Sequence, residues 1–126
     1  HSLSGHSDSD VIAHAVTDAL LGPAGLGDIG EWFPDDDPAF AGVDSMDLLA
    51  RIVDELHALG LEVVNVDCSV VAEVPKLAPS RAAMQDRLSA VVGAPVTVKG
   101  KRPEGLGAID GIACCAVALI RERGEL

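Results

Sequence analysis

The stretch DSDVIAHAVTDALL, residues 8–21, predicts a helix that combines an apolar surface with a polar row. Asp10, His14 and Asp18 lie at intervals of four residues, so a helix places their side chains in one row. Because the remaining surface is almost entirely apolar, we expect this helix to be buried. A buried imidazole between two carboxylates must be satisfied by hydrogen bonds, charges or a metal ion. The row is therefore either a satisfied polar seam or the place of a metal-ligating His14 that needs further ligands from elsewhere.

Composition and charge narrow the class of protein. The 126 residues are enough for one domain with a real core, and 48% of them are hydrophobic. The core must be aliphatic, because the chain has one Trp, two Phe and no Tyr. The net charge of −11 argues against nonspecific binding to nucleic acid or to an anionic membrane. No apolar run approaches the roughly 18 residues of a membrane span, and no signal peptide is visible, so we expect a cytoplasmic protein.

The cysteines do not form a recognisable framework. Cys68, Cys114 and Cys115 are odd in number, lie in apolar runs and have no CxxC spacing. We expect them to be small core residues in a reduced compartment rather than ligands of a zinc cage or partners in disulfides.

The rest of the chain predicts two more helices and three strands. The first helix is capped by Asp8 or Ser9 and ends at Gly22-Pro23, and an irregular segment follows over residues 25–42. A helix capped by Asp44 or Ser45 ends at Gly60, a strand covers residues 61–74, and a third helix covers residues 80–92. Shorter strands are expected at 95–100 and 111–120, and the last is apolar on both faces, which predicts a central position. The fold class is α/β (α+β two-layer), with a mixed four-stranded sheet, helices on one face and the first strand missing from the chain.

The irregular segment holds all the aromatic residues of the protein. Trp32, Phe33 and Phe40 argue against a fully disordered loop, and loops of this length in compact domains are usually functional or disordered. The acidic run at residues 35–37 either binds a cation or is simply solvated.

Positive charge gathers at the ends of the predicted strands. Lys76, Lys99, Lys101 and Arg102 fall at strand ends or in the turns that follow, where ligands of α/β folds usually bind. Glu104 lies in the same turn as the last two and could hold a cation against a phosphate. The turn is therefore either an ordinary polar turn or a phosphate site bridged by a metal ion, which an acidic protein would need for an anionic ligand.

Several segments together resemble one enzyme family. GHSDSDVIAHAVTDALLG, then LGDIGEWFPDDDPAF and a VDS at a helix start, resemble the 2-C-methyl-D-erythritol 2,4-cyclodiphosphate synthases. NVDCSVVAEVPKLAP, VTVKGKRPEGLG and GIACCAVALI follow in the family's order. The resemblance covers essentially the whole chain, and implies a single domain, residues 1–126, that lacks roughly the first 30 residues of the family pattern.

The resemblance implies a phosphorus–oxygen lyase of the non-mevalonate isoprenoid pathway. Such enzymes close 4-diphosphocytidyl-2-C-methyl-D-erythritol 2-phosphate into the cyclic diphosphate and release CMP. The 2-phosphate of the substrate attacks the β-phosphorus, so no protein nucleophile is needed. Implied cofactors are zinc, or another divalent transition metal, and magnesium or manganese. The implied assembly is a homotrimer with active sites between neighbouring subunits, without nucleic acid or membrane partners.

By position, the resemblance also assigns roles to residues. His14 would ligate zinc, Glu104 would ligate the second cation, and Glu104 and Asp35 would take part in catalysis. His6 and Ser7 would contact the methylerythritol phosphate end, residues 28–30 would include ribose contacts, and residues 72–78 would bind cytidine. The implied substrate-binding residues are His6, Ser7, Asp28, Ile29, Gly30, Phe33, Asp35, Ala72, Pro75, Lys76, Leu77, Ala78, Lys101 and Arg102.

The chain departs from the family pattern in three places. No Asp-x-His motif, which supplies the other two zinc ligands, precedes His6. Lys101-Arg102-Pro103 replaces a threonine-rich turn, and the loop over residues 107–111 is short and lacks an arginine. These departures favour an alternative, a non-catalytic relative that binds cytidine nucleotides or isoprenoid diphosphates. A metal-dependent phosphohydrolase with a linear product is a further alternative, but no sequence feature supports it over the synthase.

Overall fold

The computed structural model describes residues 5–34, 36, 44–72, 81–102 and 111–124. Along these residues the elements are α1 (Gly5–Leu21), α2 (Ile29–Trp32), α3 (Ser45–Ala58), β1 (Leu61–Ala72), α4 (Arg81–Val92), β2 (Val96–Lys101) and β3 (Ile112–Glu122). The predicted mixture of helices and a mixed sheet is confirmed. The described residues form a three-stranded sheet, and the fourth strand stays a prediction.

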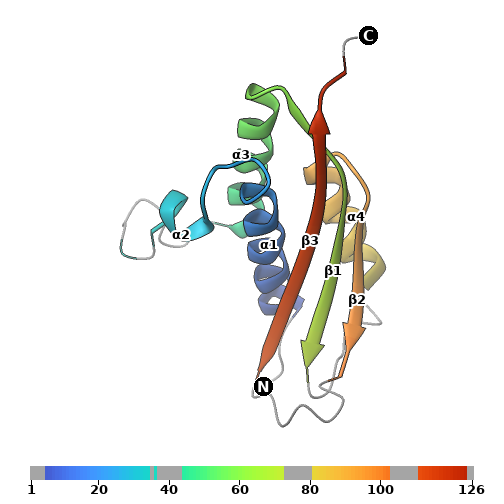
Figure 1. The fold of residues 1–126 in the computed structure, drawn as a ribbon. Coiled ribbons are helices and arrows are strands. Elements are labelled where there is room, and N and C mark those ends of the chain that lie inside the picture. The colour runs from blue at the N-terminus through green and yellow to red at the C-terminus, as the bar shows by residue number, and fades with distance from the viewer. Residues whose placement is uncertain (1–4, 35, 37–43, 73–80, 103–110, 125–126) are drawn as a thin grey trace.

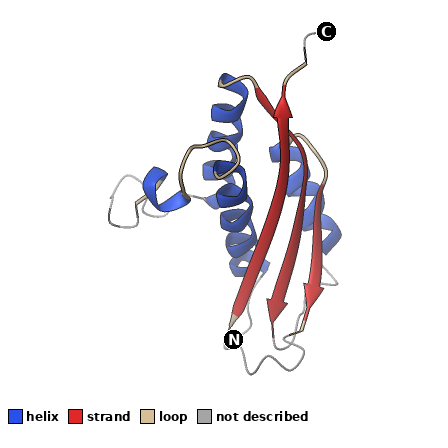
Figure 2. Cartoon of the chain, in the orientation of Figure 1, coloured by secondary structure: helices blue, strands red, loops and turns tan. Residues whose placement is uncertain are grey.

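The strand order is β2-β1-β3, with β1 in the middle. Strands β1 and β2 are parallel, with Val71 opposite Lys101, and β1 and β3 are antiparallel, with Ala72 opposite Ile112. The carboxyl ends of β1 and β2 therefore lie at the same end of the sheet as the start of β3. Helices α1, α3 and α4 pack on one face and leave the other face uncovered within the described part of the chain (Figures 1 and 2).

Helix α3 shows how local signals set an element. Asp44 is its N-cap, and the Asp44 carboxylate accepts a hydrogen bond of 2.8 Å from the backbone N–H of Met46. Leu49, Ile52 and Leu56 recur at helical spacing and are fully buried, which contributes about 1.5–3 kcal/mol each. Gly60 follows with φ of 77°, a left-handed conformation that glycine adopts without steric cost. Both predicted ends of this helix are confirmed.

Two predictions about element position were wrong. The first helix begins at Gly5, not after a cap at Asp8 or Ser9. Serine and aspartate are also tolerated in the first turns of a helix, where acidic groups meet the positive end of the dipole, so these residues do not have to mark its start. The segment at 25–42 is also not irregular throughout, because it contains the single turn of α2.

Strand β3 is at the edge of the three described strands, and the prediction that it is central was wrong. Its inner face packs against the core, but its outer face is exposed, with Val117 at 68% and Leu119 at 56%. The described residues therefore bury only one of the two apolar faces of β3.

The cysteines are divided between the two faces of the sheet. Cys68 is buried on the inner face of β1, and Cys114 is half-buried on the inner face of β3. Cys115 is exposed on the outer face, so the expectation that all three are core residues was wrong for it. No helix among the described residues is long and apolar enough to cross a membrane.

Candidate functional site

The polar row of α1 lies on the exposed side of that helix. Ile12, Ala13 and Val16 are fully buried, whereas the side chains of His14 and Asp10 are 47% and 48% exposed. The expectation of an imidazole inside a fully buried helix was therefore wrong. The apolar residues of α1 form a buried face against α3 and the sheet, and His14 points away from it. An exposed imidazole is accessible to an incoming ligand without a change in the core.

Helix α3 holds one end of the row. The hydroxyl of Ser45, in the first turn of α3, donates a hydrogen bond to Oδ1 of Asp10. The same Asp10 oxygen lies 4.0 Å from Nε2 of His14. Because Ser45 is itself buried, its bond to Asp10 fixes the carboxylate beside the imidazole. Sequence reasoning found Ser45 only as a possible helix cap and missed this long-range contact.

The other end of the row is bound to α2. Oδ1 of Asp18 accepts a hydrogen bond of 3.0 Å from the backbone N–H of Ile29. Asp28 caps α2, and its carboxylate accepts a bond of 3.0 Å from the backbone N–H of Glu31. The indole N–H of Trp32 donates to the carbonyl of Leu26 at 2.8 Å, which closes the segment onto itself. The predicted substrate segment at residues 28–30 is therefore attached directly to the row that carries His14.

Phe33 is mainly a core residue in this chain. Its side chain is 6% exposed, and the Arg51 guanidinium carbon lies 5.7 Å from the centre of its ring. The contact is a cation–π interaction between α3 and the segment after α2. Within a single subunit, the ring thus has little surface for the substrate contact that the family resemblance implies.

A second group of predicted residues lies at one end of the sheet. Lys101 ends β2 and Arg102 follows it, and both side chains are exposed. Ala72 ends β1 beside them, because β1 and β2 are parallel and paired to Val71–Lys101. Lys99 does not belong to this group, contrary to the prediction. It lies within β2, and its Nζ is 2.8 Å from Oδ2 of Asp67 on β1, so its charge is already paired.

The predicted site residues at α2 and those at the end of β1 and β2 lie apart within one chain. Figure 1 shows α2 beside α1, away from the end of the sheet where β1 and β2 end. His6 and Ser7 lie in the first turn of α1, whereas Asp28, Ile29 and Gly30 lie at α2. Asp35, Glu104 and the four predicted residues at 75–78, Pro75, Lys76, Leu77 and Ala78, fall outside the described residues.

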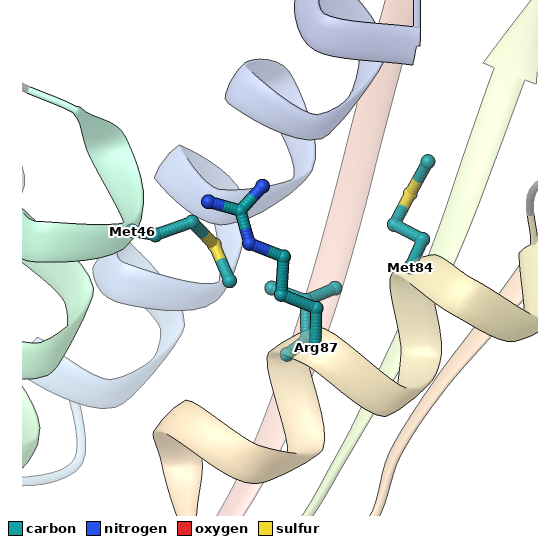
Figure 3. A pocket seen from close by; sticks show the side chains of 4 residues that line it. Met46, Met84 and Arg87 are labelled. Carbon is teal, nitrogen blue, oxygen red and sulfur yellow. The ribbon is translucent and has the colours of Figure 1, made fainter.

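A small apolar hollow lies between α3 and α4, lined by Met46, Met84, Arg87 and Leu88 (Figure 3). Arg87 reaches across it toward the start of α3, with its Nη2 3.5 Å from Oδ2 of Asp44. None of the predicted site residues lines it. The hollow is therefore a packing feature between two helices rather than part of the site around His14.

Comparison with known proteins identifies the family. The family pattern described as YgbB matches residues 1–121. The chain belongs to the YgbB family. The resemblance found in the sequence is thereby confirmed.

Several proteins similar to this chain are named as enzymes of one kind. The chain is 55% identical, over 97% of its own length and 77% of the relative's, to a 2-C-methyl-D-erythritol 2,4-cyclodiphosphate synthase of Gemmatimonas aurantiaca. It is 54% identical to the bifunctional enzyme IspD/IspF of Desulforudis audaxviator, over 94% of the chain but only 32% of that longer protein. A solved 2C-methyl-D-erythritol-2,4-cyclodiphosphate synthase in a CDP-bound form superposes with a TM-score of 0.80 at 37% identity, covering 93% of this chain and 79% of that one.

His14 has few neighbouring metal ligands within the described residues. Within the described ranges, no group of three or more His, Cys, Asp and Glu side chains could hold a metal ion. His14 has an exposed imidazole, and a carboxylate lies at 4.0 Å from its Nε2. An imidazole with a carboxylate nearby is a common arrangement for one of the ligands of a zinc site. His14 therefore fits as one ligand of a larger set.

Proposed function

We propose that this chain catalyses the closure of 4-diphosphocytidyl-2-C-methyl-D-erythritol 2-phosphate to 2-C-methyl-D-erythritol 2,4-cyclodiphosphate, with release of CMP. The observation that carries the proposal is 55% identity, over 97% of the chain, to a relative named for this product. The exposed His14 between two anchored carboxylates agrees with it. A CDP-bound structure among the solved relatives supports a cytidine nucleotide as the ligand.

The charges of the protein and of the proposed substrate together imply that metal ions are needed for binding. The protein has a net charge of −11, and the substrate is a polyanion, so bare contact between them is repulsive. His14 would hold zinc or another divalent transition metal, with further ligands outside the described ranges, and Glu104 would hold magnesium or manganese. When bound, such cations neutralise the phosphates and favour the in-line arrangement of attacking and leaving oxygens.

The protein's own residues would mainly position the substrate. Ser45 fixes the Asp10 carboxylate 4.0 Å from the His14 imidazole, and Asp18 attaches α2 to the same helix. Lys101 and Arg102 add positive charge at the end of the sheet, beside Ala72, the first residue of the predicted cytidine segment. When the reacting groups are held in line, the reaction avoids the entropy cost of bringing them together in solution.

We also propose that the active enzyme is a cytoplasmic homotrimer whose sites lie between subunits. Two features support this. The predicted site residues form two groups that lie apart in one chain, so neighbouring copies can bring them together. The outer face of β3 exposes Val117 and Leu119, an apolar surface that a second and third copy would cover.

The direct test is CMP release from the synthetic substrate with zinc and magnesium added. Replacement of His14 by Ala should reduce the rate by at least about 100-fold, because it removes a ligand of a charge-stabilising metal ion. His57→Ala, in the last turn of α3, is the matched control and should retain normal turnover. Zinc content per chain should fall in the first variant and stay unchanged in the second.

Two outcomes would decide against the synthase. CMP binding without turnover, measured calorimetrically in the presence of both metals, would support the non-catalytic alternative. A linear phosphorylated product, identified by phosphorus NMR, would indicate a phosphohydrolase.

A further inference from the structure

The turn that leads into α2 places a carboxylate directly over a glycine. Gly27 has a φ of 88°, a left-handed conformation that glycine adopts without steric cost. A Cβ atom at this position would lie 2.7 and 2.9 Å from the two carboxylate oxygens of Glu31. The Glu31 side chain is therefore folded back over the start of α2, in space that is open only because residue 27 has no side chain.

Glu31 belongs to a capping arrangement. Asp28 is the N-cap of α2, and its Oδ1 accepts a hydrogen bond of 3.0 Å from the backbone N–H of Glu31. An acidic N-cap followed three residues later by Glu, with the Glu side chain turned back toward the cap, is the arrangement of a capping box. Because α2 has only four residues, it depends on such contacts for its shape.

The capping arrangement determines where the Asp28 carboxylate points. The hydrogen bond from the Ile29 N–H to Asp18 attaches α2 to α1, but it does not involve the side chain of Asp28. Oδ1 of Asp28 is occupied by the Glu31 N–H, whereas Oδ2 accepts no hydrogen bond from the part of the chain that the structure describes. Oδ2 is therefore the atom of this carboxylate that can accept a hydrogen bond from a ligand hydroxyl.

We propose that Glu31 is a positioning residue, whose carboxylate above Gly27 keeps the Asp28 carboxylate turned toward a nucleotide ligand. This inference rests on the proposed function, in which residues 28–30 include the contacts to the ribose of the substrate. Glu31 acts through Asp28 and does not itself touch the ligand. Its loss should therefore weaken binding and leave the chemistry at phosphorus unchanged.

Gly25 provides a matched control for backbone strain. Its φ is 71°, and no described atom lies within 4 Å of a Cβ placed there. Gly25→Ala and Gly27→Ala therefore introduce similar strain, but only Gly27→Ala also displaces the Glu31 carboxylate. Glu31 is exposed, so its displaced side chain moves into solvent without disturbing the core.

The experiment compares Gly25→Ala, Gly27→Ala, Glu31→Ala and Glu31→Gln in the full chain. Calorimetric titration with CDP measures binding, and CMP release gives KM and kcat separately. Trp32 is the only Trp of the chain and is bonded within the same segment, so its fluorescence emission reports the shape of α2. Thermal unfolding verifies that the two glycine variants lose similar stability.

The variants that move or remove the carboxylate should share one pattern. Gly27→Ala and Glu31→Ala should each weaken CDP binding and raise KM about fivefold, with kcat within about twofold of the unmodified chain. Both should shift the emission of Trp32. Glu31→Gln keeps the shape and one carbonyl oxygen, so it should retain most of the affinity. Gly25→Ala should bind CDP as the unmodified chain does.

The double variant Gly27→Ala/Glu31→Ala completes a mutant cycle. Because both single changes remove the same contact, the double variant should bind CDP only as weakly as Glu31→Ala alone. Unchanged CDP affinity in Glu31→Ala would overturn the role of this residue. Equal losses in Gly25→Ala and Gly27→Ala would assign the effect to strain, and additive losses in the double variant would show that the two positions act separately.

Failure of this inference can be distinguished from failure of the proposed function. If the unmodified chain binds CDP but releases no CMP from the substrate, the proposed reaction is wrong, and the CDP affinities of the variants still decide the role of Glu31. If the unmodified chain turns over and Glu31→Ala matches it in KM and in CDP affinity, the inference alone is wrong.

Discussion

The polar row of α1 and the outer face of β3 are both exposed, but exposure has opposite energetic consequences for them. His14 remains hydrated between Asp10 and Asp18, and exposure of such polar groups to water carries no penalty. Val117 and Leu119 keep apolar area in water, which costs about 25 cal/mol for each Å² that a partner could cover. The polar row can therefore stay open for a small ligand. The apolar face would gain stability if another surface covered it.

The largest effect is expected from a charge placed on the apolar face. If the proposed trimer forms, Leu119→Lys should convert it to monomers, because the substitution would bring like charges together between copies. Activity should fall by more than about 100-fold, since a shared site loses its alignment. Sedimentation velocity and CMP release measure the two effects. Leu59→Lys changes another exposed leucine, at the C-cap of α3, and should alter neither.

Removing the anchor at Ser45 tests whether the polar row needs a fixed geometry. Ser45→Ala should lower the free energy of unfolding by about 1–2 kcal/mol, because Asp10 loses its hydrogen-bond donor. Zinc affinity should fall about 10-fold as the carboxylate beside His14 moves. Denaturant unfolding and metal competition report the two quantities. A double-mutant cycle with Asp10→Ala that shows no coupling would contradict the proposed link.

Loss of the hydrogen bond between Ile29 and Asp18 should have a smaller effect, mainly on substrate binding. Asp18→Ala removes the acceptor for the Ile29 N–H and should cost about 1 kcal/mol of stability. KM should rise severalfold while kcat changes little, because the role proposed for residues 28–30 is to contact the ribose of the substrate and not the reacting phosphorus. Asp18→Asn keeps a carbonyl oxygen at the same place and should restore most of the loss. A fall in kcat alone would assign Asp18 a different role.

The smallest effect is expected at the ion pair on the outer face of the sheet. Lys99→Met should cost no more than about 1 kcal/mol, because the Lys99–Asp67 pair is exposed. Lys101→Met should raise KM more than Lys99→Met, since its charge is not used by that pair. Steady-state kinetics on both variants decide the point. A large stability loss in Lys99→Met would mean that the apolar interface extends over this part of the face.

Local sequence signals predicted much of the fold correctly. The limits of α3, the long strand β1 and the helix α4 were found because caps, glycine stops and helical spacing act over a few residues. The order and parallel pairing of strands could not be read in this way. The central position assigned to β3 failed because an apolar strand face looks the same in the sequence whether the described structure buries it or leaves it exposed.

The sequence by itself determined the family, the aliphatic core, the polar row on the first helix and the elements that follow it, because each depends on residue type at fixed spacing. Only the tertiary structure decided that His14 is exposed, that Ser45 and Ile29 hold the carboxylates on either side of it in the sequence, and that Lys99 pairs with Asp67. These contacts join residues far apart in the chain. Their geometry is set by how helices and strands pack, and no local pattern records that packing.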